Sequence, residues 1–506
     1  MGSLPSPSYA QGEVNNWVFG GRDIWLEFST GAPEYSSIAM QQFPEVLTGP
    51  YPPVDWNYSQ SIPYNYFFAT SFQAASVSDK HGNLLFYANG ETIYHKNLDT
   101  LWTSNSILID RTEAYQSLFI PKPGNSNRYY YFSVPGNYLH LGLRYTELDI
   151  TLNNGLGGVV GTPHQILMWE SASKVTATYH ANGKDIWLLA HEVNSNNFRA
   201  YLISESGVSP NDYVVSSIGS TYTVSCCPTP APFHGTPVHG QMKFSPSGEN
   251  LVVAVEGFHT VEVFDFNKET GGLSDPLAIN LFQPNYVEFS SDGTLAYVGN
   301  AYFVSGFHFD TSGIYQIDLL AGDSNAIANS ISRTTPNPWF YGWTISPADC
   351  VNSIQLAYDG SIIISCNRHE PVTGLFAPHY LSAIANANAP VPESELVLDY
   401  YTFPNTMFRP NNLPSFFPPF LDRNILFANT CLNDSVLICT QTNTHFDSIR
   451  WEFTDPLLGL ISIPNQDTIY HQFPGFGPYD ITLKRYRNAG MEHVVKKRLY
   501  IYPTAN

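Results

Sequence analysis

A chain of 506 residues is too long for one compact core, so more than one domain is expected. Only 13% of the residues are charged and 14% are aromatic, a composition that fits pleated sheets and tight turns better than helices. The net charge of −20 disfavours a phosphate backbone as partner, so no nucleic acid is expected, and no apolar run approaches the ~20 residues of a membrane span.

The first twelve residues have the character of a signal-peptide remnant or a tag. Residues 4–10 end in the small residue Ala10, of the kind that signal peptidase prefers, and Gln11 follows it. Residues 1–12 are therefore expected to lie outside the folded domains. The protein is expected at the cell surface or in the extracellular space, exported by a cleaved signal peptide.

One pattern recurs between residues 13 and 420: an apolar strand, a turn close to Ser-x-Asp-Gly, and a second apolar strand. The glycine supplies the positive φ that the hairpin turn needs, and Asp, Asn or Ser bonds to the turn backbone. A third strand follows most copies, as in Thr260–Phe266. The clear and the looser copies are Val77–Tyr87, Ser117–Phe132, Thr178–Leu189, Lys243–Val253, Glu288–Tyr297 and Gln355–Ile364.

Three or four short antiparallel strands every ~45–60 residues are typical of the blades of a β-propeller. The copies predict six blades, and an N-terminal strand around residues 17–28 would form a seventh with strands near residues 395–420. We therefore expect an all-β chain in which residues 13–420 form a seven-bladed propeller, with six or eight blades as alternatives. A β-solenoid fits less well, because the spacing is too long and uneven for one.

A different pattern begins after residues 410–419, a stretch rich in Pro, Asn and Phe with the composition of a linker. Short strands then alternate with turns, as in Thr468–Phe473 and Gly477–Leu483. Residues 421–506 are therefore expected to form an immunoglobulin-like β-sandwich of about seven strands. Trp451 is the expected centre of its core.

The six cysteines do not have the spacing of a zinc site, because no two of them form a Cys-x-x-Cys motif. Cys350 and Cys366 flank a predicted hairpin, and Cys431 and Cys439 lie in the last domain. In an exported protein each pair is a candidate for a disulfide, with free buried thiols as the alternative. The adjacent cysteines 226 and 227 receive no assignment.

In consistent order, residues 13 to about 420 resemble the propeller-bearing surface proteins of the Bacteroidota that the type IX secretion system exports. These proteins are often labelled gliding-motility-associated. The resemblance implies the propeller fold and the export route, and it assigns no functional residues. The segments that carry it are Asn15–Gly20, Ser76–Glu91, Pro121–Asn127, His180–Trp187, Lys243–Gly248, Leu381–Asn388 and Leu413–Phe416.

The last domain resembles a PKD domain, which has a characteristic Trp-x-Phe-Gly-Asp core. The match rests on Trp451–Asp455, Phe473 and Tyr479–Leu483. Thr454 stands in place of the usual glycine, so a different turn is expected there. In the resembled proteins a C-terminal sorting domain follows such a PKD domain. The resemblance implies that this domain is a spacer or docking unit.

Aromatic residues in two charge-poor segments are the first candidates for a binding surface, because rigid exposed rings stack on sugars or anchor protein partners. Packing between blades is their alternative role. Histidines near predicted strand ends form a second group, suited to a rim site for a metal or sugar, with ordinary loop positions as the alternative. The candidates are Trp56, Tyr58, Trp339, Tyr341, Trp343, His191 and His369, and His234 and His239 belong to the same group of histidines; no metal or cofactor is expected.

No catalytic signature accompanies these candidates. The chain has no Gly-x-Ser-x-Gly elbow, P-loop or dinucleotide-binding motif, so its status as an enzyme is left open. We expect a non-catalytic cell-surface binding or adhesion protein whose partner is an extracellular protein or glycan. One alternative is a structural component of a cell-surface, type IX secretion or gliding assembly, with an outer-membrane or secretion-machinery partner. The other is a polysaccharide hydrolase or lyase with its site in the propeller funnel.

Overall fold

The computed structural model is an all-β structure, and its α-helices within the described residues, α1 (Leu152–Gly155) and α2 (Ser324–Asn329), are short. No helix in this part of the chain is long and apolar enough to cross a membrane. The described residues are 16–19, 24–27, 34–37, 74–79, 82–88, 92–97, 99–103, 114–135, 142–223, 238–300, 313–334, 353–357, 360–365, 380–402, 413–421, 424–440, 446–487 and 491–501.

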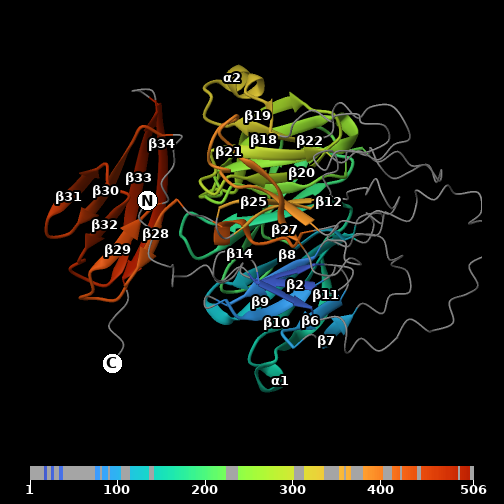
Figure 1. The fold of residues 1–506 in the computed structure, drawn as a ribbon. Helices are drawn as coiled ribbons and strands as arrows, with labels where there is room; N and C mark the ends of the chain where they lie inside the picture. Colours follow the sequence, from blue (N-terminus) through green and yellow to red (C-terminus); the bar gives the residue numbers. More distant parts are fainter. Residues whose placement is uncertain are drawn as a thin grey trace, which may run out of the picture.

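Antiparallel sheets follow one another along residues 16–402 (Figure 1). Each is a meander in which a strand pairs with the strands before and after it in sequence. The first sheet has three described strands and each of the others has four. The strands of the first sheet are β1 (Asn16–Phe19), β2 (Ile24–Glu27) and β3 (Glu34–Ser37).

The next sheets share this meander topology. Between residues 75 and 217 the strands are β4 (Ala75–Ser78), β5 (Leu84–Ala88), β6 (Thr92–His95) and β7 (Thr100–Thr103), then β8 (Ala114–Lys122), β9 (Asn125–Pro135), β10 (Leu143–Asp149) and β11 (Gly158–Met168), then β12 (Ser171–Tyr179), β13 (Ile186–Glu192), β14 (Asn197–Ile203) and β15 (Tyr213–Ser217). Between residues 242 and 402 they are β16 (Met242–Phe244), β17 (Asn250–Val255), β18 (Thr260–Asn267) and β19 (Gly272–Asn280), then β20 (Pro284–Phe289), β21 (Leu295–Asn300), β22 (Gly313–Asp318) and β23 (Ser332–Arg333), then β24 (Ser353–Leu356), β25 (Ile362–Ser365), β26 (Tyr380–Ile384) and β27 (Leu396–Thr402).

The first strand of each sheet lies against the first strand of the next, from β4 through β8, β12, β16 and β20 to β24. The sheets therefore stand side by side around an axis, with their first strands innermost and their last strands outermost. This arrangement of four-stranded meanders is a β-propeller, as the recurring hairpins predicted.

The inner strands are apolar on both faces because each sheet packs between two neighbours. In β17, Leu251 and Val253 belong to the core shared with the sheet β12–β15. Val252 and Ala254 point the other way, into the core shared with the sheet β20–β23. A strand buried on both faces reads as a continuous apolar run rather than as an alternation.

The predicted hairpin turns are confirmed. In five of the six copies the glycine amide donates to the carbonyl three residues earlier, at 2.8–3.0 Å. The same glycines have φ values between 68° and 86°, which an L side chain rarely adopts. They are Gly82, Gly183, Gly248, Gly293 and Gly360.

Each four-stranded meander returns the chain to the face from which it entered. The glycine turns lie on one face of the propeller, which we call the turn face. The strand ends that border the links between sheets, and those that border the links between second and third strands, lie on the opposite face, which we call the link face. Described parts of the link face are residues 169–170, 193–196, 256–259, including the 3-10 helix η4 (Glu256–Phe258), and 281–283.

Residues 413–421 connect sheets that are far apart in sequence. Ser415 forms a parallel bridge with β4, and its amide donates to the Ala74 carbonyl at 2.8 Å. Phe416 packs into the core of the sheet β24–β27, whereas Phe417 packs with the sheets β8–β11 and β12–β15. The 3-10 helix η7 (Pro418–Leu421) ends the segment.

Two further sheets form a separate sandwich after the propeller, seen beside it in Figure 1. Their facing sides share one core, whose described members all lie within residues 425–501. Trp451 is fully buried at its centre, as predicted, and its Nε1 donates to the Gln466 carbonyl at 2.7 Å. The strands are β28 (Leu426–Ala428), β29 (Val436–Cys439) and β32 (Thr468–His471), facing β31 (Gly459–Pro464), β30 (Ser448–Asp455), β33 (Gly477–Arg487) and β34 (Met491–Ile501).

The disulfide considered for Cys431 and Cys439 is wrong, since both are free thiols. Cys439 lies in β29 opposite Leu426 of β28, and Cys431 lies in the turn that connects these strands. The other cysteines, at positions 226, 227, 350 and 366, lie outside the described residues, as do residues 1–12.

Candidate functional site

Four of the sequence-derived candidates lie in two parts of the chain that flank described strands of the link face. β23 ends and β24 begins at this face, on either side of residues 335–352. β25 ends and β26 begins there, on either side of residues 366–379. Candidates outside the described residues are Trp56, Tyr58, Trp339, Tyr341, Trp343, His369 and His234.

His191 is described, and the expectation that it faces an exposed rim is wrong. It is the penultimate residue of β13, and its side chain is fully buried. Its ring stacks on Tyr222, with 3.7 Å between ring centroids, and meets the edge of Phe198. The next residue, Glu192, reaches the surface, where it pairs with Arg199. The strand alternation therefore turns the histidine inward and the carboxylate outward.

Beneath the link face, Lys174 of β12 carries a fully buried ammonium group. Its Nζ donates to the carbonyls of Gly240 at 2.7 Å and Ala254 at 2.9 Å, and also to that of His239. Three acceptors thus match the three donors of the ammonium. A register shift between Ser171 and Val175 accompanies this position. Lys174 therefore joins the sheet β12–β15 to the sheet β16–β19.

A carboxylate and a phenol extend this polar group. The Tyr222 hydroxyl donates to Glu262 Oε2 at 2.8 Å, and the Ser220 amide donates to Oε1 at 2.8 Å. The Tyr222 ring centroid lies 5.6 Å from Lys174 Nζ. We call Lys174, His191, Tyr222 and Glu262, together with the buried Glu256, the Lys174 cluster.

Burial dominates the electrostatics of the Lys174 cluster. It lowers the pKa of Lys174 to about 7, although the carboxylates of Glu256 and Glu262 act in the opposite direction. Burial, together with the charge of Lys174, lowers the pKa of His191 to about 3, so its imidazole is neutral at physiological pH. Burial and Glu262 raise the pKa of Tyr222 well above its ordinary value. Such perturbed groups are common at functional sites, but here they are closed to solvent, so their direct role is to hold two sheets together.

Two large aromatic side chains are exposed on the link face above this region. Trp169, in the link between β11 and β12, is 63% exposed. Phe258, in the link between β17 and β18, is 41% exposed. Beside it, His259 stacks on Phe282, with 4.7 Å between ring centroids. The described link face therefore presents rings that can stack on a planar or apolar ligand surface.

A second buried polar group spans the inner strands of the propeller. Lys243 of β16 pairs with Glu288 of β20 at 2.8 Å and donates to Gln355 of β24 at 3.1 Å. The Leu356 amide also donates to Glu288 at 2.7 Å. Glu288 therefore forms an ion pair and, with the Phe289 amide as second donor, accepts two backbone hydrogen bonds inside the propeller.

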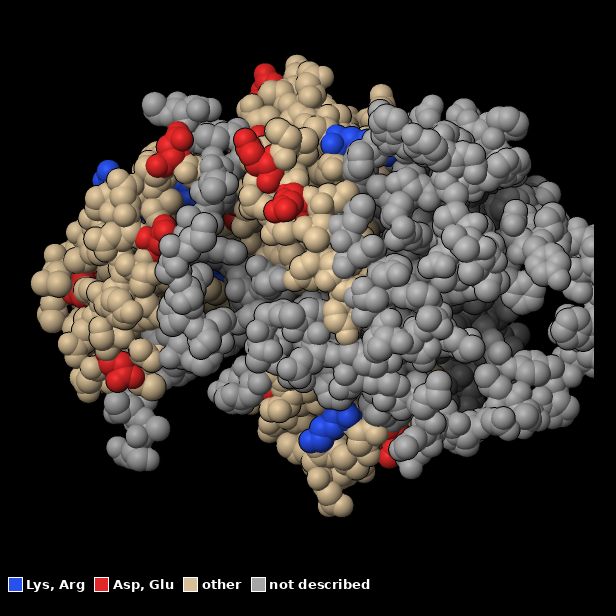
Figure 2. Space-filling view, viewed as in Figure 1, with Lys and Arg blue, Asp and Glu red and all other residues tan. Residues whose placement is uncertain are grey.

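The charged groups on the face that Figure 2 shows are dispersed over its described residues. In the view of Figure 2, acidic side chains are scattered over the sandwich and the propeller, and the few basic ones form no continuous patch. Within the described residues, no group of three or more His, Cys, Asp or Glu side chains is arranged to hold a metal ion.

Sequence reasoning did not find Lys174, Glu262 or Trp169. Lys174 does leave a signal, since it is the single charged residue of the strand Ser171–Tyr179. Its acceptors are backbone carbonyls from another sheet, and a pattern of side chains in the sequence cannot predict them. The sequence around Trp169 has no feature that marks it as exposed. Only the course of the links in the folded chain shows that it lies on an exposed face.

No family model and no curated protein matches the chain. Solved structures with a similar arrangement include the periplasmic gluconolactonase of Pseudomonas aeruginosa, at 13% identity and a TM-score of 0.35, covering 78% of this chain and 95% of that one. A protein of unknown function from Desulfotomaculum acetoxidans is 12% identical with a TM-score of 0.38, covering 79% of this chain and 100% of that one. Hydrazine synthase of Kuenenia stuttgartiensis is 11% identical with a TM-score of 0.34, covering 67% and 80% respectively. At these values the similarity assigns no activity, ligand or residue role to this chain.

Proposed function

We propose that the chain is a secreted, non-catalytic binding protein of the cell surface, in which the link face of the propeller recognises an extracellular glycan or protein. The exposure of Trp169 and Phe258 on that face carries the proposal. Large aromatic side chains that stay in contact with water are available to a partner and gain most from being covered.

Seven blades are part of this proposal. Residues 413–416 would supply the innermost strand of a blade whose outer strands are β1, β2 and β3. Ser415 supports this reading, because it lies parallel to β4, as the first strands of neighbouring blades do. The closing blade would then join the two ends of residues 13–420 and hold the propeller shut.

The sandwich, residues 421–506, is proposed to be a PKD-type immunoglobulin-like spacer. Its separate core and its buried Trp451 support this assignment. Export through a cleaved signal peptide and the type IX route belongs to the same proposal and is supported by the resemblance of the sequence. N-terminal sequencing of protein recovered from the cell surface tests it, with Gln11 expected as the first residue.

The binding role is tested by applying the whole chain to a glycan array and to soluble polysaccharides. We expect retention on a subset of glycans without release of reducing ends. Substituting Trp169→Ala together with Phe258→Ala should weaken retention at least about tenfold, because both rings leave the contact surface.

Tyr470→Ala is the matched control, since it removes an aromatic ring that is 66% exposed on the sandwich. Its retention should equal that of the unaltered protein. Release of reducing ends without stable retention would instead support the hydrolase or lyase alternative and reject the binding role.

A second candidate function, a component of a surface assembly, is supported by one feature of the sandwich. Large apolar side chains are 66–79% exposed in the β30–β31 hairpin, in β32 and in the loop after it. The side chains are Leu457, Leu458, Leu460, Tyr470 and Phe476. Exposed apolar groups gathered on one domain mark a surface that a protein partner covers.

Co-sedimentation with isolated outer membranes tests this second role. The unaltered chain should sediment with the membranes, and a variant with Leu457→Asp and Leu458→Asp should remain in the supernatant. The Trp169→Ala variant serves as control and should sediment normally. Equal sedimentation of all three would exclude docking through the hairpin.

A further inference from the structure

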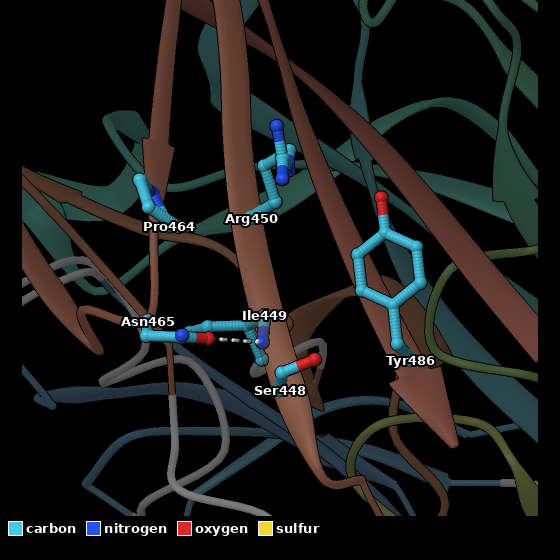
Figure 3. Close-up of a pocket in the computed structure, with 6 residues that line it drawn as sticks. All are labelled: Ser448, Ile449, Arg450, Pro464, Asn465 and Tyr486. Carbon is cyan, nitrogen blue, oxygen red and sulfur yellow. Dashed lines mark hydrogen bonds between the residues drawn. The ribbon is translucent and has the colours of Figure 1, made fainter. Parts of the chain in front are cut away.

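The sandwich carries a hollow of about 300 Å³ on the outer face of its four-stranded sheet. Figure 3 shows the side chains that surround it, which come from β30, β33 and the end of β31. The lining residues are Ser448, Ile449, Arg450, Pro464, Asn465 and Tyr486.

The strand period places the polar side chains of this hollow on one face. Ser448 and Arg450 are two residues apart in β30, so both point away from the core that holds Trp451. Ser448 lies opposite Tyr486 of β33, and Arg450 lies opposite Pro464 of β31. Three neighbouring strands therefore contribute to a single site on the outer face.

Asn465 is held in a fixed orientation at the edge of the hollow. Its Oδ1 accepts from the Ile449 amide at 3.3 Å, and its own amide donates to the Ile449 carbonyl at 2.8 Å. Its backbone is left-handed, with φ of 53°. Because Oδ1 is engaged, the side-chain NH₂ is the group that Asn465 offers to a ligand.

The hollow is lined by donors on a protein that is otherwise acidic. Arg450, Tyr486, Ser448 and Asn465 all supply N–H or O–H groups, and no carboxylate lines the hollow. Arg450 makes one long hydrogen bond to Ser462, at 3.4 Å, and no ion pair within the described residues.

The neighbouring carboxylate on this face of β30 does not compete for Arg450. Glu452 pairs with Lys484 of β33 at 3.2 Å, so its charge is already compensated. In the described part of the chain no carboxylate therefore engages the guanidinium fork of Arg450, and such a fork matches the two oxygens of a carboxylate.

We propose that this hollow binds the carboxylate-bearing ring of an acidic saccharide. Arg450 receives the carboxylate, Ser448 and the Asn465 NH₂ donate to ring or hydroxyl oxygens, and the Tyr486 ring flanks the sugar. A volume of about 300 Å³ lies at the small end of ligand sites and suits one sugar unit rather than a folded peptide. The proposal concerns the sandwich alone and does not depend on recognition by the link face of the propeller.

Titration calorimetry of the whole chain with glucuronate, glucose, sodium sulfate and N-acetyl-aspartate amide tests the site. We expect glucuronate to bind with a dissociation constant of roughly 1 mM, and glucose to bind at least about tenfold more weakly because it leaves Arg450 unpaired. Arg450→Ala should weaken glucuronate binding at least about tenfold. Arg450→Lys should recover only part of the loss, since it keeps the charge but not the fork.

Lys496→Ala is the matched control. Lys496 is an exposed cation on β34 of the same sheet and does not line the hollow, so its loss should change glucuronate affinity less than about twofold. Equal losses in the Lys496 and Arg450 variants would reduce the effect to general charge attraction and overturn the proposal. It is also overturned if sulfate or N-acetyl-aspartate amide binds as tightly as glucuronate, or if glucuronate gives no binding at ~20 mM.

Discussion

At the scale of single residues, Lys174 shows how a buried charge can be accommodated without a carboxylate in direct contact. Its three donors meet three backbone carbonyls, and the Tyr222 ring lies near the charge. The burial still lowers the pKa to about 7, which means that the folded state holds this proton less firmly than the unfolded chain does.

The depressed pKa predicts the sign of a pH dependence. An unfolded lysine keeps its proton up to ~10.4, so between about 7 and that value the unfolded state binds more protons than the folded one. The free energy of unfolding contributed by Lys174 should therefore rise with pH, by at most ~1.4 kcal/mol per pH unit. Urea unfolding of the unaltered chain and of Lys174→Met at pH 6.5, 7.5 and 8.5 measures this contribution. The difference in the free energy of unfolding between the two proteins should grow as the pH rises.

Lys184→Met is the control for this slope, because Lys184 is an exposed lysine in the β12–β13 turn. Its difference from the unaltered chain should stay constant across the same pH range. A constant difference for Lys174→Met as well would show that the buried amine does not change its protonation on unfolding.

At the scale of elements, the glycine turns and the inner strands follow directly from local sequence. A glycine at positive φ is required by the backbone of each turn, whatever packs around it. How costly a side chain becomes there depends on the neighbouring sheet. A Cβ on Gly248 would overlap the Thr178 side chain of β12, whereas one on Gly155 would meet nothing within 4 Å.

This contrast predicts different costs for the same substitution. Gly248→Ala should lower the free energy of unfolding by roughly 2–4 kcal/mol, since it adds overlap with Thr178 to the strain of a φ of 76°. Gly155→Ala, with a φ of 83° and open space around it, should cost only about 1 kcal/mol. Urea midpoints of the two variants compare them, and equal costs would mean that the contact between β12 and the β16–β17 turn is looser than described.

At the scale of the whole molecule, the cores of the propeller and the sandwich are separate. The core around Trp451 contains no described residue from before position 425. We therefore expect two calorimetric transitions, with Trp451→Ala lowering the stability of the sandwich by about 3–5 kcal/mol and leaving the propeller transition in place. Tyr470→Ala removes an exposed ring from the same domain and should shift neither transition. A single transition that moves as a whole in Trp451→Ala would show that the two units unfold together.

The candidate site was less predictable than the fold, and His191 shows why. Its position at the end of an apolar strand is compatible with a rim or a core location, and only packing against Tyr222 and Phe198 decides for the core. Trp169 shows the converse, because a tryptophan beside a strand is more often buried, yet this one stands exposed on the link face. Exposure depends on which sheets lie next to a link, and that information is not local.

Sequence alone determined the all-β class, the hairpin repeat and the central place of Trp451, because these depend on strand period, turn geometry and residue size within short segments. Tertiary structure decided which charges are buried and paired, from Lys174 and its carbonyls to Lys243 and Glu288. It also decided that Arg450 lines the same hollow as Tyr486 and forms no ion pair within the described residues, while Glu452 pairs with Lys484. These partners come from different strands or sheets, and their meeting is set by register and packing, which no local pattern encodes.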